Sequence, residues 1–222
     1  MLGEKIKELR RDLIEYATFV ENMIDKSVNG LLRRDKSWLN EVIEKDEPKA
    51  NYMEIVLDEL CTGMIAQYQP KAKDLRTILM VLKINNDLER VADYAVNISK
   101  SALFLIERPQ VKPLIDIPKM AEESVKMLKD SINSYINENP VLAHNVCQRD
   151  SIVDEFGNRI LKELIAFMSA EPTTVERSLH LLKIARSLER IADLSTNICE
   201  DVIFMVEGEI IKHRITERDV VF

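Results

Sequence analysis

The sequence predicts an all-α protein made of six long helices. Its 222 residues include five Gly and seven Pro, which is too little turn punctuation for a sandwich or barrel, where a turn is needed about every 8–12 residues. Between the prolines, apolar residues recur with the 3.6-residue spacing of a helix. Because proline is costly inside a helix and favourable in its first turn, the prolines indicate where the helices begin and end.

Three helices are expected before the richest run of prolines. The first extends from about residue 4 to 33, along one apolar stripe. Asp35 is expected to cap a second helix that runs to about residue 68, and Pro70 marks the turn into a third helix ending near Ile106.

The segment RPQVKPLIDIPK at 108–119 holds three prolines and is expected to be a linker. Beyond it, three more helices are expected, the first to about residue 138, the next from Pro140 to about 169, and the last from Pro172 to about 207. The predicted division is a first three-helix bundle at 1–108, a linker at 109–118 and a second three-helix bundle at 119–222.

The two halves contain an internal repeat. LKINNDLERVADYAVNI at 82–98 and LKIARSLERIADLSTNI at 182–198 align without a gap and share ten of seventeen positions. A match this close within one chain indicates duplication. We therefore expect two tandem up-down-up units, each packed as a coiled-coil-like bundle.

The repeated helices carry polar residues at four-residue steps, which places them on one helix face. These residues are Glu89, Asp93 and Asn97 in the first copy and Glu189, Asp193 and Asn197 in the second. The preceding helix of each half also carries such residues: Glu47, Asn51, Glu54 and Asp58 in the first half, and Asp150 and Asp154 in the second.

Helical hairpins predict which of these side chains meet. Residues facing each other across a tight turn have numbers that lie symmetrically about it, and the turns are expected at Pro70 and between Glu171 and Pro172. The predicted pairs are Glu47 with Asp93 and Asn51 with Glu89 in the first bundle, and Asp150 with Asp193 and Asp154 with Glu189 in the second.

Acidic side chains gathered in this way repel one another, at about 0.2–0.5 kcal/mol for one i,i+4 pair on a helix. Oxygen-only ligand sets suit hard divalent cations such as Mg²⁺, Ca²⁺, Mn²⁺ or ferrous iron, and carboxylates on facing bundle helices build multinuclear metal sites. The alternative is a solvated acidic face balanced by Arg90, Arg190 and Lys100. The pattern alone leaves both open.

Composition excludes several other functions. The net charge of −7 argues against nucleic acid as the main partner and against adsorption to an anionic membrane. The charged start MLGEKIKELRR is unlike a signal peptide, and no run of about 18 apolar residues occurs, so we expect a cytoplasmic protein without membrane insertion. Cys61, Cys147 and Cys199 are too scattered for a disulfide framework or a thiolate metal site.

The segments LERVADYAVNI and LERIADLSTNI, with QPKAKDLR at 69–76, resemble the PhoU family of phosphate-transport accessory proteins. The resemblance spans essentially the whole chain, up to GEIIKH at 208–213. It implies two three-helix bundles with pseudo-two-fold symmetry. It also implies a negative regulator of phosphate uptake and of the phosphate-starvation response, with two partners: the ATPase subunit of an ABC phosphate transporter and a sensor histidine kinase. A homodimer is expected because symmetric association is common.

The resemblance also implies metal clusters of iron, zinc, manganese or magnesium. The residues it assigns to them are Glu47, Asn51, Glu89, Asp93, Asp150, Asp154, Glu189 and Asp193, flanked by Asn97, Asn197 and Glu200. The chain departs from the family pattern in several places: Ala92 and Ala192 replace the usual glycines, Asn51 stands where acids are common, Lys100 corresponds to Glu200, and Pro48 interrupts the ligand helix.

The sequence is also compatible with two other functions. One is a metal-free helical adaptor whose acidic faces dock on basic partner surfaces. The other is a carboxylate-bridged di-metal enzyme of ferritin type, which typically needs Glu-x-x-His pairs. None occurs in this sequence, so we expect a protein that is not an enzyme.

Overall fold

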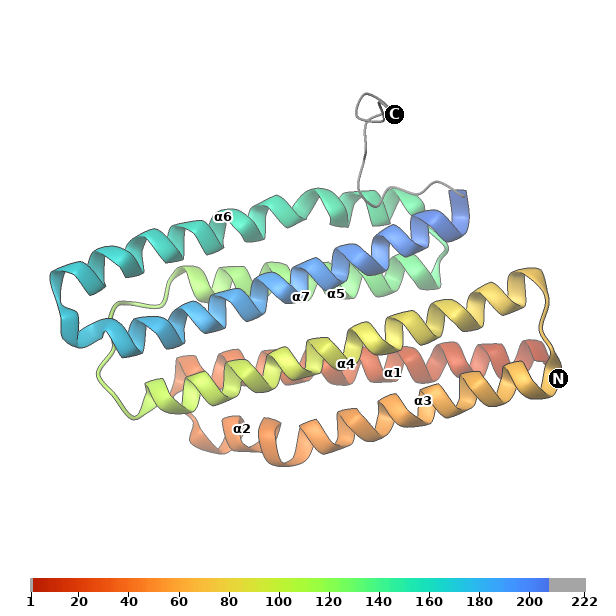
Figure 1. Ribbon diagram of the computed structural model, residues 1–222, viewed down its shortest axis with the longest axis horizontal. Helices are drawn as coiled ribbons and strands as arrows, with labels where there is room; N and C mark the ends of the chain where they lie inside the picture. The colour runs from red at the N-terminus through yellow and green to blue at the C-terminus, as the bar shows by residue number, and fades with distance from the viewer. Residues whose placement is uncertain (1, 208–222) are drawn as a thin grey trace, which may run out of the picture.

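The computed structural model describes residues 2–207, and this part of the chain contains helices and no strand (Figure 1). The helices are α1 (Leu2–Arg33), α2 (Lys36–Glu41), α3 (Glu47–Tyr68), α4 (Ala72–Ile106), α5 (Asp116–Ile136), α6 (Pro140–Ala170) and α7 (Val175–Glu207). A π-helical segment, Val42–Asp46, joins α2 to α3, and a 3₁₀ turn, Pro172–Thr174, precedes α7. The predicted all-α fold is confirmed, with α2, the π-helical segment and α3 forming one long rod. Residues 208–222 of the predicted second bundle, including GEIIKH, lie outside the described residues.

Side-chain caps define two of the helix starts. The Asp35 carboxylate accepts hydrogen bonds from the backbone N–H groups of Ser37 at 2.9 Å and Trp38 at 3.2 Å, as predicted for a cap. The Asn139 side chain likewise accepts from the N–H of Leu142 at 3.1 Å, and Pro140 occupies the first turn of α6. In residues 2–207, no helix is both long and apolar enough to span a membrane.

Pro48 explains the π-helical segment before α3. Proline has no N–H to donate to the carbonyl four residues back, and its ring would clash with that carbonyl in a regular helix. The wider π-helical turn at Val42–Asp46 comes directly before it, and Pro48 falls in the first turn of α3. The chain thus passes the proline without breaking the rod.

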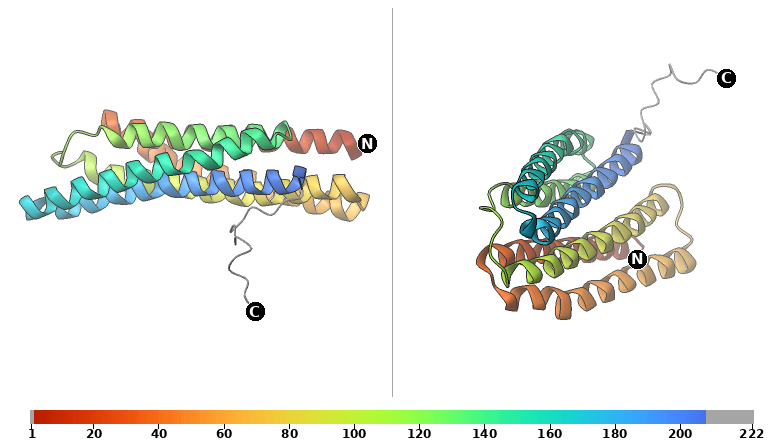
Figure 2. Two further views of the ribbon diagram at one scale, coloured as in Figure 1. Left: turned by 90° about the horizontal axis from the view of Figure 1, so that it is seen from above. Right: turned by 60° about the vertical axis from the view of Figure 1, so that its left-hand side comes forward.

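The helices form two bundles that lie against each other. Helices α1, α3 and α4 pack together, as do α5, α6 and α7, and the bundles meet where α4 packs on α7 and α1 on α5 (Figure 1; Figure 2, right). Leu88 and Leu188, equivalent positions of the internal repeat, are both fully buried. The apolar stripes read from the sequence therefore form the bundle cores.

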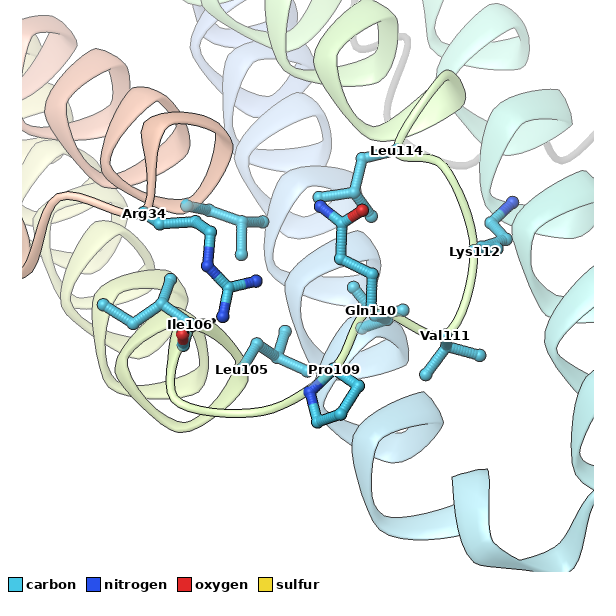
Figure 3. A pocket seen from close by; sticks show the side chains of 10 residues that line it. Arg34, Leu105, Ile106, Pro109, Gln110, Val111, Lys112 and Leu114 are labelled. Atoms are coloured by element: carbon cyan, nitrogen blue, oxygen red, sulfur yellow. Dashed lines mark hydrogen bonds between the residues drawn. The ribbon is translucent and has the colours of Figure 1, made fainter.

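The linker between the bundles is shorter than its prolines suggested, because α5 already begins at Asp116 and Pro118 lies in its first turn. Arg34 donates hydrogen bonds to the carbonyl oxygens of Ile106 and Arg108, the latter at 3.1 Å (Figure 3). Arg177 donates to the carbonyl of Pro109 at 2.9 Å. The hollow beneath the linker measures about 20 Å³, room for about one water molecule, so it is no ligand site.

Candidate functional site

In the second bundle, four carboxylates lie in one electrostatic neighbourhood where α6 passes α7. Burial raises the pKa of Asp150 to about 6, and the charges of Asp154, Asp193 and Glu189 add to the rise. Burial also raises the pKa of Glu189, again with a contribution from Asp154 and Asp193. These are the four residues predicted to face one another, and we call them the second acidic face.

The apolar stripe of α6 explains why Asp150 is half buried. The fully buried residues on this helix are Ala143, Val146, Val153, Ile160 and Leu164. Position 150 falls between Val146 and Val153 in the same seven-residue pattern, so an acid occupies a place that would otherwise be apolar. The surrounding low-dielectric environment disfavours its ionised form.

Gly157 shapes the hollow beside this face. A Cβ atom at position 157 would lie 3.4 Å from the Glu189 carboxylate oxygen Oε2. A side chain at position 157 would thus contact Glu189 directly, which places this part of α6 beside the Glu189 carboxylate. A surface hollow of about 240 Å³ lies there, lined by Asp154, Gly157, Asn158, Leu161, Leu182, Ala185, Arg186 and Glu189.

Arginines balance part of the second acidic face. Arg190 donates a hydrogen bond to Asp193 at 2.9 Å, and the charges of Arg190 and Arg186 oppose the rise in the pKa of Glu189. Within residues 2–207, neither Asp150 nor Asp154 has an ion-pair partner. The negative charge is thus left uncompensated on the α6 side.

The first bundle has a corresponding face with a different member. Burial raises the pKa of Glu89, and the charges of Asp93 and then Glu54 raise it further. The pKa of Glu54 is also raised, first by burial and then by Asp58. The buried Asn85 side chain ties α4 to this part of α3, donating to the Glu54 carbonyl at 2.9 Å and to Asp58 Oδ1 at 3.4 Å. We call Glu54, Asp58, Glu89 and Asp93 the first acidic face.

The side chain of α3 that acts on Glu89 lies three residues beyond the predicted partner Asn51. The pairs of Asn51 with Glu89 and of Glu47 with Asp93 stay predictions. Asn51 is exposed, Glu47 is half buried, and the charge from α3 that acts on Glu89 is that of Glu54. The position of the turn determines only which residues of α3 and α4 lie at the same height along the hairpin. The rotation of each helix about its axis determines which side chain points toward the neighbouring helix. On α3 the buried stripe consists of Ala50, Leu57, Cys61 and Met64, and position 54 completes it.

The internal repeat relates the acidic residues of the two faces to each other. The repeat relates α4 to α7 with an offset of 100 residues. The same offset, applied to the preceding helices α3 and α6, relates Glu54 to Asp154 and Ala50 to Asp150. Ala50 is fully buried. The first acidic face thus lacks the counterpart of Asp150, the residue whose ionised form is most disfavoured in the second.

The three flanking residues diverge. The charge of Glu200 acts on the Cys147 thiol, as does that of Asp150, so Glu200 extends the second acidic face along α7. Asn197 is half buried on α7. Asn97 instead lines a groove between α4 and α7 together with Lys100 and Lys183.

The side chains of the two acidic faces do not converge as closely as the ligands of a metal site. In the described part of the chain, no group of three or more His, Cys, Asp or Glu side chains is placed to hold a metal ion. The donor chemistry nevertheless fits a hard cation, because the second acidic face offers only carboxylate oxygens as ligands. Two of its four carboxylates, those of Asp150 and Asp154, have no ion-pair partner within residues 2–207. Near the first face, the Tyr16 hydroxyl is buried without a hydrogen-bond partner, and the charges of Glu89, Glu54 and Asp93 act on it.

Comparisons with known proteins agree with the repeat. The family described as PhoU domain matches residues 13–102 and 117–202. A phosphate-specific transport system accessory protein PhoU homolog of Aquifex aeolicus is 37% identical over 96% of each chain. PhoU homolog 2 of Thermotoga maritima is 35% identical over 96% of this chain and 90% of its own.

A solved structure shares the fold as well as the sequence. The crystal structure of PhoU from Pseudomonas aeruginosa superposes with a TM-score of 0.89 at 30% identity, covering 94% of this chain and all of its own. Its agreement includes both halves of the molecule, as do the matched family segments. The chain therefore belongs to the PhoU family.

Proposed function

We propose that this protein is a phosphate-transport accessory protein that negatively regulates phosphate uptake and the phosphate-starvation response. The observation that carries the proposal is the family match in both repeats. Relatives that are named as accessory proteins of phosphate transport align over 96% of the chain. The role is non-enzymatic and cytoplasmic, and a homodimer is the proposed state. The proposed partners are the ATPase subunit of an ABC phosphate transporter and a sensor histidine kinase.

Co-purification tests the partners. The full chain is expected to recover both the transporter ATPase and the kinase from cells, in amounts that differ between excess and limiting phosphate. Deleting the gene is expected to raise phosphate uptake and expression of phosphate-starvation genes. Recovery of neither partner, with unchanged uptake in the deletion strain, would remove the regulatory assignment.

We further propose that the second acidic face holds a divalent cation, with iron, zinc, manganese and magnesium as the candidates. Asp150, Asp154, Glu189 and Asp193 would supply the ligands. A bound cation would offset their mutual repulsion, which adds to the effect of burial in raising the pKa of Asp150. The first acidic face would bind more weakly, because Ala50 stands at the position of Asp150 and Asp58 already accepts a hydrogen bond from Asn85.

Elemental analysis tests this site. Wild-type protein, purified without affinity metals, is compared with an Asp150→Asn/Glu189→Gln double variant. Glu155→Gln is the matched control, since Glu155 is an exposed acid on the same helix beside the face. We expect the metal to be lost from the double variant and kept in the control. Equal metal content in all three proteins would exclude the site.

A metal-free adaptor is the second candidate function. The Arg190–Asp193 hydrogen bond favours it, because it balances part of the face without any cation. In that case the acidic faces would orient basic partner surfaces and raise the rate of association. Metal-stripped protein would then bind both partners as tightly as metal-loaded protein, and the affinity would fall with added salt.

A further inference from the structure

A basic groove lies between the two bundles, next to the hollow beside Glu189, with which it shares Arg186. It forms where α4 passes α7 in the opposite direction (Figure 1) and has a volume of about 410 Å³. Its lining consists of Asn97, Lys100 and Ser101 from α4 and His180, Lys183, Arg186 and Ser187 from α7. The lining thus includes three residues that are always cationic near neutral pH and no acid, in a chain whose net charge is −7.

These cations are not used for internal ion pairs. Within residues 2–207, Lys100, Lys183 and Arg186 form no salt bridge. Burial, and then the charge of Lys183, lower the pKa of the half-buried His180, against an opposing effect of Glu176. His180 stacks on Phe104, with ring centroids 3.9 Å apart, and this stack links the two helices beside the groove.

The pseudo-two-fold symmetry of the fold supplies an internal comparison. The offset of 100 residues relates the groove to a second place along the same α4–α7 contact, where Lys83 pairs with Asp201 at 3.1 Å. Its counterpart in the groove is Lys183 beside Ser101, where the acid is missing. The counterparts of Lys100, Ser101, Lys183, Arg186 and Ser187 are Glu200, Asp201, Lys83, Asn86 and Asp87.

The same backbone arrangement therefore carries opposite charge at its two ends. One end has three basic residues and no acid, and the other has one lysine among three acids. Helix packing does not require the basic set, because the counterpart packs with a neutralised lysine. Three unpaired cations repel one another, and an anion between them would relieve that repulsion.

We propose that the basic groove binds a small anion bearing phosphoryl groups. An arginine fork and two lysines are the side chains that recognise phosphate oxygens, and Asn97 and Ser101 add neutral hydrogen-bond donors. The groove volume falls within the range of about 300–1,000 Å³ typical of small-molecule sites. The ligand class is inorganic phosphate, pyrophosphate or a nucleotide.

This site shares no carboxylate with the acidic faces and does not depend on the proposed metal. Arg186 is the one residue common to the groove and to the hollow beside Asp154 and Glu189. The test therefore replaces the lysines and leaves Arg186 in place. Chelator in the buffer keeps cations on the acidic faces from contributing.

Isothermal titration calorimetry on the full chain tests the proposal. The probes are inorganic phosphate, pyrophosphate and ATP, with sulfate as the non-phosphoryl oxyanion, all at equal ionic strength. The variant is Lys100→Ala/Lys183→Ala, and the matched control is Lys83→Ala, which changes the symmetry-related lysine. All three lysines are exposed, so circular dichroism is expected to show unchanged helix content.

We expect at least one phosphoryl probe to bind wild-type protein and the Lys83→Ala control alike. The double variant is expected to lose affinity by about tenfold or more for each lysine, the effect of one charged hydrogen bond. The probe that binds most tightly identifies free phosphate or a nucleotide as the ligand. Absence of binding by all phosphoryl probes, equal affinity in the double variant, or sulfate binding as tightly as phosphate would overturn the proposal.

Discussion

Replacing Asp150 with asparagine is expected to stabilise the metal-free protein at neutral pH. A pKa of about 6, against an ordinary value of 3.8, corresponds to at most about 3 kcal/mol acting against the ionised folded form. Asp150 is still partly open to solvent, and screening reduces this to about 1–2 kcal/mol. Asparagine keeps the shape of the side chain and removes the charge, so the free energy of unfolding is expected to rise by that amount.

The pH dependence gives this prediction its sign. Because the folded-state pKa of Asp150 is raised, its ionisation destabilises the fold at pH values above about 6. The penalty shrinks as the pH falls through that value and is gone below the ordinary pKa of 3.8. The gain in the free energy of unfolding from Asp150→Asn is therefore expected at about pH 7.5, above the raised pKa, and is expected to be absent at about pH 3.5, below the ordinary pKa.

Urea denaturation followed by far-ultraviolet circular dichroism, in buffer with chelator, measures the effect. At neutral pH the midpoint of thermal unfolding is also expected to rise, by about 2–4 °C per kcal/mol for a protein of this size. Glu155→Gln, an exposed acid on the same helix, is expected to change stability by less than about 0.5 kcal/mol. A destabilised Asp150→Asn protein, or a gain that is the same at both pH values, would refute the reasoning.

Three further outcomes are expected. Addition of Mn²⁺ at about 100 times its dissociation constant should stabilise wild-type protein by about 2.7 kcal/mol. No such gain should appear in the Asp150→Asn/Glu189→Gln variant. Equal thermal shifts in both proteins would contradict a metal site at the second acidic face. Leu188→Ala, at a fully buried position, should lower the free energy of unfolding by about 2–5 kcal/mol in urea titrations, and a loss below that range would mean that the core collapses around the cavity. Gly63→Ala should raise the free energy of unfolding by about 0.5–1 kcal/mol, because the new Cβ meets no atom within 4 Å. Gly30→Ala should lower it, because its Cβ would lie 2.6 Å from the buried Leu39 side chain. The same sign for both alanine variants would show that the contact with Leu39 is relieved without cost.

Much of the fold could be predicted because its determinants are local. Apolar spacing set the buried stripes, and caps such as Asp35 and Asn139 set helix starts through backbone groups only two or three residues away. The second hairpin could also be read, since α6 and α7 run without interruption and Asp150 sits in a regular seven-residue stripe. The structure accordingly brings its four predicted carboxylates into one neighbourhood.

The first hairpin could not be read in the same way. Its turn was placed correctly near Pro70, but the choice between Asn51 and Glu54 depends on which side of α3 is packed against α4. The π-helical segment before Pro48 also lies on this rod, and it changes the local winding that simple spacing assumes. The repeat offset relates Glu54 to Asp154, whereas turn symmetry pairs Asn51 with Glu89.

The six rods, their duplication and the two sets of acids on the repeated helices follow from the amino-acid sequence, because each depends on residues within a few turns of one another. The packing of α4 along α7 in the opposite direction, which gathers Lys100, Lys183 and Arg186 in one groove, is a property of the folded molecule (Figure 1). Those residues come from helices far apart in the chain, and no periodicity within either helix records how the two bundles meet. Contacts of that kind are chosen by the packing of whole surfaces, which local patterns do not encode.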